Sequence, residues 1–173
     1  MENSVLVLML SGLSQKEMTR FRDFAHSPYF NKHERVREFT SLLWNCYPRF
    51  DDLILTKKKV FEALFPEEDF SEGKVNDLMS YTVKLLERFL AIEQFESNSF
   101  ATKEAVVKQM LARRMAKPAR KKMAELAKMT DKKTAIDEQH YCDLLHQKSL
   151  DDAYHLQLQS HTQHPGAQQK VDS

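Results

Sequence analysis

The stretch LSQKEMTRFRDFAHSPYFN, residues 13–31, decides the fold because a helix start, an apolar face and a helix stop follow one another in it. Ser14 and Glu17 have the spacing of a capping box. In that motif the Ser hydroxyl accepts the third amide of the helix, and the Glu carboxylate accepts the amide of the capping residue. The sequence therefore predicts a helix that begins near Gln15.

This helix should be amphipathic and short. Its apolar residues recur every three or four positions and form one face: Met18, Phe21, Phe24 and Ala25. Ser27-Pro28 ends it, because the residue before a proline is pushed out of the helical conformation and proline has no amide hydrogen. Tyr29 and Phe30 follow outside the helix, and we expect both rings to fill the gap between helices.

The composition of the whole chain predicts an all-α fold. The 173 residues include only three glycines and five prolines, whereas 42% are hydrophobic, which is typical of long helices and few turns. Cys46 and Cys142 are far apart and suggest no disulfide framework, so we expect a reducing, cytoplasmic setting. The apolar run at residues 5–10 is too short to span a membrane.

Residues 1–98 are expected to form an N-terminal bundle of about five helices. Proline, glycine and capping residues place the other helices at about 3–10, 32–47, 57–65 and 71–96. We expect Gly12 to close the first in the left-handed conformation, and Asn31 and Thr56 to cap the third and fourth.

The helix at 71–96 has the longest apolar face of the chain, and the others should pack around it. That face comprises Val75, Leu78, Met79, Thr82, Leu85, Leu86, Phe89, Leu90 and Ile92. In the connections, Leu53, Leu55 and Phe70 are the expected apolar anchors.

The character of the chain changes after Ser97-Asn98-Ser99, where we place a boundary. Helices at about 102–116, 117–129 and 134–158 have the rhythm of helical hairpins, so residues 99–158 are predicted to be an α-solenoid-like extension. Residues 159–173 are nearly all polar and are predicted to be a disordered tail.

Positive charge is concentrated in this second part. Residues 100–135 hold 11 basic and 3 acidic side chains, and the densest run comprises Arg113, Arg114, Lys117, Arg120, Lys121 and Lys122. Such a run can contact nucleic-acid phosphates or an acidic partner. It can equally be a solvated face, and no aromatic residue lies between the charges to stack on bases.

Residues 56–90 offer an alternative function. A short helix, an acidic turn and a longer helix resemble the helix-turn-helix layout of response-regulator DNA-binding domains. Two features argue against DNA binding by this element. The residues of the longer helix that could contact bases are spread over four turns: Lys74, Asn76, Lys84 and Arg88. In addition, acidic residues near the start of that helix would repel phosphate.

Motifs of catalysis and metal binding are missing from the sequence. No glycine-rich phosphate loop, GxSxG elbow or HExxH is present. Cys142 and His146 share a helix face and His140 lies off it, so the number of ligands falls short of a zinc site. We therefore expect no enzyme activity, no metal and no cofactor.

Several segments together resemble the N-terminal region of uncharacterised, all-helical proteins from Bacteroidota. The likeness is carried by SPYFN at 27–31 and by LTK…LFP at 55–66, with support from LMSYTVKLLERFLAIEQ further on, and it covers roughly residues 3–155. Members of that group are usually longer and continue into further helices. The resemblance implies a helical fold and a cytoplasmic setting, and it implies no activity or cofactor.

These observations favour a cytoplasmic, non-enzymatic scaffold that binds another protein and does not enter a membrane. The alternative is a DNA-binding regulator that uses residues 56–90 together with the basic run at 113–122.

Overall fold

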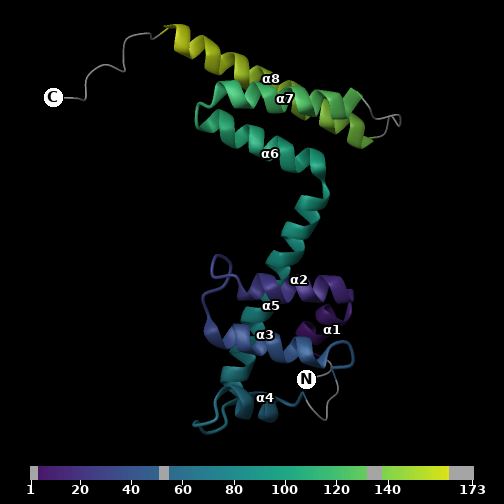
Figure 1. Ribbon diagram of the computed structural model, residues 1–173, viewed down its shortest axis with the longest axis vertical. Coiled ribbons are helices and arrows are strands. Elements are labelled where there is room, and N and C mark those ends of the chain that lie inside the picture. The colour runs from purple at the N-terminus through teal and green to yellow at the C-terminus, as the bar shows by residue number, and fades with distance from the viewer. Residues whose placement is uncertain (1–3, 51–54, 132–137, 164–173) are drawn as a thin grey trace, which may run out of the picture. The chain divides into compact units, whose positions relative to one another are not determined.

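The computed structural model describes residues 4–50, 55–131 and 138–163, and it is all-helical over those residues, as predicted (Figure 1). The chain divides into two compact units, Met1–Glu93 and Gln94–Ser173. The helices of the described residues are α1 Val5–Ser11, α2 Gln15–His26, α3 Glu34–Cys46, α4 Lys57–Leu64, α5 Glu72–Ser97, α6 Ser99–Ala112, α7 Ala116–Asp131 and α8 Glu138–Gln163.

The first unit is built around α5, as its apolar pattern predicts. The buried residues of α5 are Val75, Leu78, Thr82, Leu85, Leu86 and Phe89. They join a single core that also takes in residues of α1, α2, α3 and α4. The stripe is narrower than predicted, because Leu90 is exposed and Met79 is only half-buried.

Helix α2 lies against α5 through aromatic rings. The rings of Phe21 and Phe24 both have their centroids 5.6 Å from that of Phe89. At the edge of this contact, Arg20 and Glu93 form an ion pair of 2.5 Å. Burial of three large rings fixes the two helices to each other.

The start of α2 is the capping box that the sequence predicts. Glu17 N donates to Ser14 Oγ at 3.3 Å, and Ser14 N donates to Glu17 Oε2 at 2.7 Å. The hydrogen bonds from the Ser14 side chain and backbone hold the pKa of Glu17 below its usual range. Thr56 caps α4 in the same way, since its hydroxyl accepts from Lys59 N at 3.2 Å.

The corner between α2 and α3 differs from the prediction. Tyr29 is 80% exposed, because successive residues of a tight turn point to different sides, and only Phe30 packs inward, stacked on Phe24 at 4.0 Å between centroids. Asn31 does not cap α3. It is buried and donates to Ala25 O at 2.8 Å while accepting from His33 N at 2.9 Å, so it ties the two sides of the corner together.

Three smaller predictions are also corrected or limited. Gly12 has φ −79°, so α1 closes without a left-handed residue. Phe70 is 48% exposed and only meets the edge of the Phe61 ring, because the connection before α5 runs over the surface. Leu55 is buried as expected, whereas Leu53 lies outside the described residues.

The second unit contains α6, α7 and α8, each of which contacts the other two (Figure 1). Its buried apolar cluster is small and comprises Phe100, Val107, Leu126 and Leu150. The units divide after Glu93, where the buried stripe of α5 has ended, whereas the sequence places the boundary at 98/99.

The predicted disordered tail, residues 159–173, starts before the last helix has ended. Helix α8 runs to Gln163, because glutamine, serine and histidine extend a helix that is already formed and the first strong breaker is Pro165. Residues 164–173 lie outside the described residues.

Replacing Phe89 by Ala is expected to cost about 3–5 kcal/mol of unfolding free energy, because the ring is buried between two others. Trp44, the single tryptophan, lies in the same unit, so its fluorescence in a urea titration follows this unfolding. The matched control is the exposed neighbour Leu90→Ala, which should stay within about 0.5 kcal/mol of the wild type. Equal losses for both variants would contradict the packing.

Candidate protein-interaction surfaces

Helix α6 has one buried face and one open apolar face. Asn98 starts the helix by accepting from Ala101 N at 3.0 Å. Phe100 and Val107 then point into the small core of the second unit. Because successive α-helical residues are 100° apart, Val106 points away from the direction of Val107 and is exposed.

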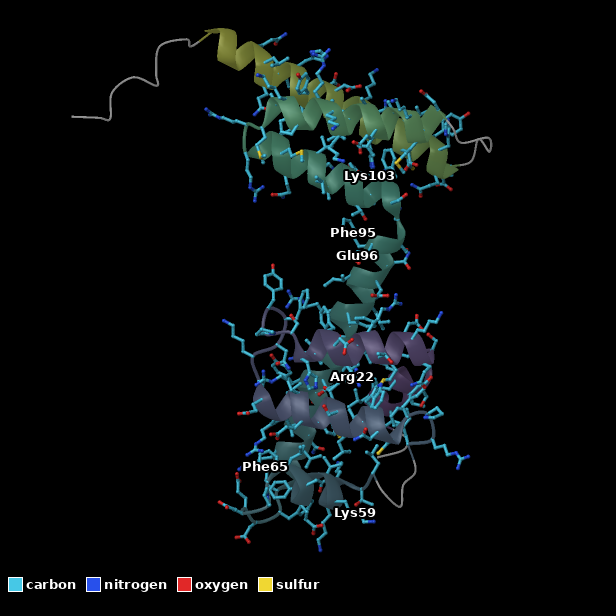
Figure 2. The ribbon with its side chains drawn as sticks, viewed as in Figure 1. Arg22, Lys59, Phe65, Phe95, Glu96 and Lys103 are labelled. Carbon is cyan, nitrogen blue, oxygen red and sulfur yellow. The ribbon has the colours of Figure 1, made fainter. Side chains whose placement is uncertain are left out.

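This open face forms a solvent-accessible hollow of about 420 Å³, the α6 groove, lined by Phe95, Thr102, Ala105, Val106, Gln109, Met110, Arg113 and Met115. Phe95 comes from the last turn of α5 (Figure 2), and its carbonyl accepts a hydrogen bond of 3.0 Å from the Thr102 hydroxyl. The three large apolar side chains Phe95, Val106 and Met115 are each 42–45% exposed. An apolar hollow of this size on the surface is typical of a binding site.

Arg113 is the only charged residue that lines the α6 groove. It follows the last turn of α6, and its Nη1 donates to Gln109 O at 3.0 Å. No ion pair with a carboxylate is found for it within residues 4–50, 55–131 and 138–163. Its charge is therefore available to an acidic ligand.

The basic run predicted from the sequence gathers at one end of the α6–α7 hairpin. Arg113 and Arg114 form the turn, where Arg114 has φ 57°. Lys117, Arg120 and Lys121 are exposed on the first turns of α7, and their spacing of three and four residues puts them on one face.

Lys122 departs from this pattern. It lies off that face, is half-buried and pairs with Glu125 at 2.8 Å. The hydrogen bond from Lys122 keeps the pKa of Glu125 below its usual range. Five of the six predicted residues are thus brought together, and Lys122 is engaged within its own helix.

The helices of the proposed helix-turn-helix element exist, but the polar candidates on α5 do not form one face. Two residues along a helix turn by about 200°, so Asn76 points away from Lys74. Lys74 pairs with Glu68 and lies 5.3 Å from the Phe65 ring centroid, and the Arg88 guanidinium lies 5.1 Å above the Phe30 ring. Two of the four candidates are therefore engaged with the protein itself.

A second hollow, of about 290 Å³ in the first unit, is lined by the cationic side chains of Arg35 and Lys74 beside the ring of Phe65. Arg35 lies 5.4 Å from that ring and pairs with Glu38 at 2.8 Å. Lys74 pairs with Glu68. Each cation already has a carboxylate partner, so the hollow has little charge left for a ligand.

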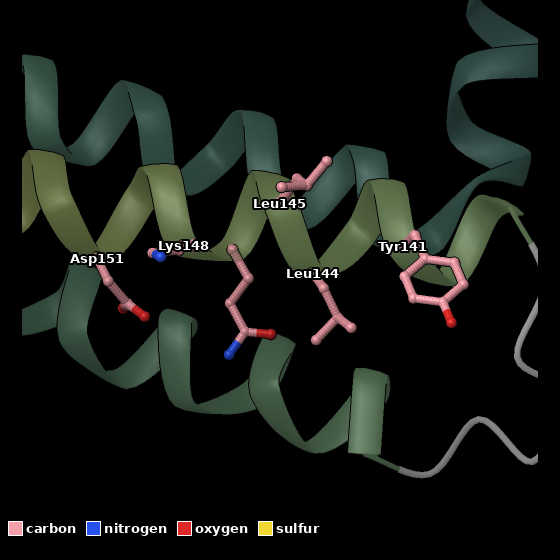
Figure 3. Close-up of a pocket in the computed structure, with 6 residues that line it drawn as sticks. Tyr141, Leu144, Leu145, Lys148 and Asp151 are labelled. Atoms are coloured by element: carbon pink, nitrogen blue, oxygen red, sulfur yellow. The ribbon is translucent and has the colours of Figure 1, made fainter.

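Helix α8 has a second apolar surface, which the sequence analysis missed. Tyr141, Leu144 and Leu145 are exposed, and they border an open hollow of about 460 Å³ together with Gln147, Lys148 and Asp151 (Figure 3). Figure 3 shows Leu144 and Leu145 pointing to opposite sides of the helix axis. The signal was present, because apolar residues recur every three or four positions opposite the buried Leu150.

Buried polar groups lie between α6 and α8. Glu104 is buried and meets Lys108 and His146, the latter at 3.2 Å between Oε2 and Nδ1. Cys142 is exposed and His140 is half-buried. Within the described part of the chain, no group of three or more His, Cys, Asp or Glu residues is placed to hold a metal ion.

No protein-family model, curated protein or solved structure matches the chain. The resemblance to helical Bacteroidota proteins therefore stays a prediction. None of the helices among the described residues has both the length and the apolar composition that crossing a bilayer requires.

The two cysteines should react at different rates with a thiol reagent. Cys142 is exposed on α8, whereas Cys46 is partly covered at the end of α3 and burial raises the pKa of its thiol. A higher pKa leaves less thiolate at neutral pH, and the thiolate is the reactive form. Alkylation followed by peptide mass spectrometry should therefore modify Cys142 first. Preferential modification of Cys46 in the folded protein would contradict the structure of the first unit.

Proposed function

We propose that this protein is a non-enzymatic helical scaffold whose second unit binds an acidic, amphipathic helix of another protein in the α6 groove. The observation that carries the proposal is the combination of exposed Phe95, Val106 and Met115 with the charge of Arg113, for which the described residues supply no carboxylate partner. Helices that dock in apolar grooves present a row of apolar side chains at spacings of three, four and seven residues.

Charge supports the choice of an acidic partner. The turn after α6 and the first turns of α7 add Arg114, Lys117, Arg120 and Lys121 beside the groove residue Arg113 in sequence. A partner with carboxylates next to its apolar row would be steered towards this end of the hairpin and held in one orientation. A reducing compartment such as the cytoplasm suits the chain, since Cys46 and Cys142 are both free thiols.

Two synthetic helical peptides with the same apolar row test the proposal, one with Glu and one with Lys at the flanking positions. Fluorescence anisotropy should show binding of the acidic peptide to the full chain, weakened by salt. Arg113→Glu should weaken it about tenfold, since it converts attraction into repulsion at a charged contact. Val106→Glu should abolish it, because it puts a charge into the apolar hollow.

The matched control is Ser149→Glu, which adds the same charge at an exposed position of α8 outside the groove. This variant should bind like the wild type. Equal affinity for the acidic and basic peptides, or binding that survives Val106→Glu, would contradict the proposal.

Nucleic-acid binding is the second candidate, favoured by the exposed cations at the end of the α6–α7 hairpin. A short DNA duplex titrated over a salt series should then lose affinity steeply as salt rises, and Arg120→Ala with Lys121→Ala should reduce that slope. Val106→Glu should leave duplex binding far less affected than it leaves peptide binding. A flat salt response would reject this function.

A further inference from the structure

We infer that the outer face of α8 binds a second copy of this chain in antiparallel orientation. The face consists of Tyr141, Leu145, Lys148, Asp152 and Leu156, which we call the α8 row. These residues are all exposed, and Leu145 and Leu156 are 68% and 67% exposed. The inference goes beyond the proposed function, because it concerns a different helix face and a different partner.

The α8 row is one continuous face of the helix. Tyr141, Leu145, Lys148, Asp152 and Leu156 follow one another at spacings of four, three, four and four residues, which keeps them within about one side of an α-helix. On the opposite side, Leu150 and Asp143 are buried against the rest of the unit. Figure 3 shows Lys148 on α8 between Leu145 and Asp151.

The α8 rows of two copies are complementary in charge only when the two helices run antiparallel. With the twofold axis at residue 150, Lys148 of one copy lies opposite Asp152 of the other. A twofold axis repeats this contact, so two opposite-charge pairs flank the axis, and the apolar side chains of the row lie farther from it on both sides. A parallel, in-register pair would instead set Lys148 against Lys148 and Asp152 against Asp152, which repel.

Neither charge has an ion-pair partner among the residues that the structure describes. Lys148 and Asp152 lie one helical turn apart, yet the described residues contain no ion pair of either one. A partner of uniformly acidic or basic character would satisfy one of them and repel the other, whereas a second copy satisfies both.

The small core of the second unit gives a physical reason for such pairing. Among the described residues, its buried cluster consists of Phe100, Val107, Leu126 and Leu150, with Leu111, Met123 and Met129 packed partly buried against it. Small units with limited apolar burial commonly gain stability by association. Covering the α8 row with its counterpart would remove exposed Tyr141, Leu145 and Leu156 side chains from water.

Sedimentation equilibrium of the full chain over a concentration series tests the inference. The wild type should move from the 20.3 kDa monomer to a dimer as concentration rises. Leu145→Glu should remain monomeric, and its helical circular dichroism should match the wild type because residue 145 is exposed. Lys128→Asp is the matched control, an exposed charge reversal on α7 that should leave dimerisation unchanged.

Charge exchange tests the antiparallel register. Lys148→Asp or Asp152→Lys alone should each weaken the dimer about tenfold, because two attractive pairs become repulsive. The double variant should restore wild-type affinity, since the pairs are merely exchanged. A wild type that stays monomeric, a dimer that survives Leu145→Glu, or a double variant no better than the singles would overturn the inference.

These variants leave the α6 groove intact. A failure of self-association with retained peptide binding would overturn the α8 inference alone. Loss of peptide binding with a normal dimer would overturn the proposed function alone.

Discussion

Burial of Phe89 under the rings of Phe21 and Phe24 is the contact on which the first unit depends. It fixes α2 to α5, and the buried stripe of α5 then gathers α1, α3 and α4 into one core. A helix as short as α1 or α4 has too few internal hydrogen bonds to be stable alone, so its structure follows from this packing. After Phe89 no further residue of α5 is fully buried: Ile92 and Glu93 are partly covered, and Leu90 and Phe95 are exposed.

The two units differ in how completely they use their apolar side chains. The first buries residues from five helices in one cluster and leaves Val5 and Leu8 exposed on the short helix α1, whereas the described part of the second has a cluster of four buried residues and leaves Val106, Met115, Leu145 and Leu156 exposed. Exposed apolar surface raises the free energy of the protein in solution, so the open apolar hollows along α6 and α8 favour binding there. The candidate interaction surfaces thus follow from a unit whose described helices are incompletely covered.

Local chemistry explains what the sequence could predict. Ser14 and Thr56 cap helices because their hydroxyls reach amides only three residues away, and these contacts need no other part of the fold. Asn31 was assigned a cap on the same rule and instead ties Ala25 to His33, since burial at the corner left its amide facing two backbone segments. Tyr29 and Phe70 were misplaced because the side to which a turn residue points depends on the packing of the helices around it.

At the candidate sites, the charged residues could be predicted from the sequence, whereas the exposed apolar residues could not. The basic run could be located from the sequence, because a lysine or arginine is exposed almost wherever it lies. Val106 and Leu145 could not be distinguished from Val107 and Leu150, since all four are apolar residues in amphipathic helices and only the presence of a covering helix separates them. An apolar binding surface is therefore defined by what the rest of the fold leaves uncovered, and it becomes visible only when the helices are placed.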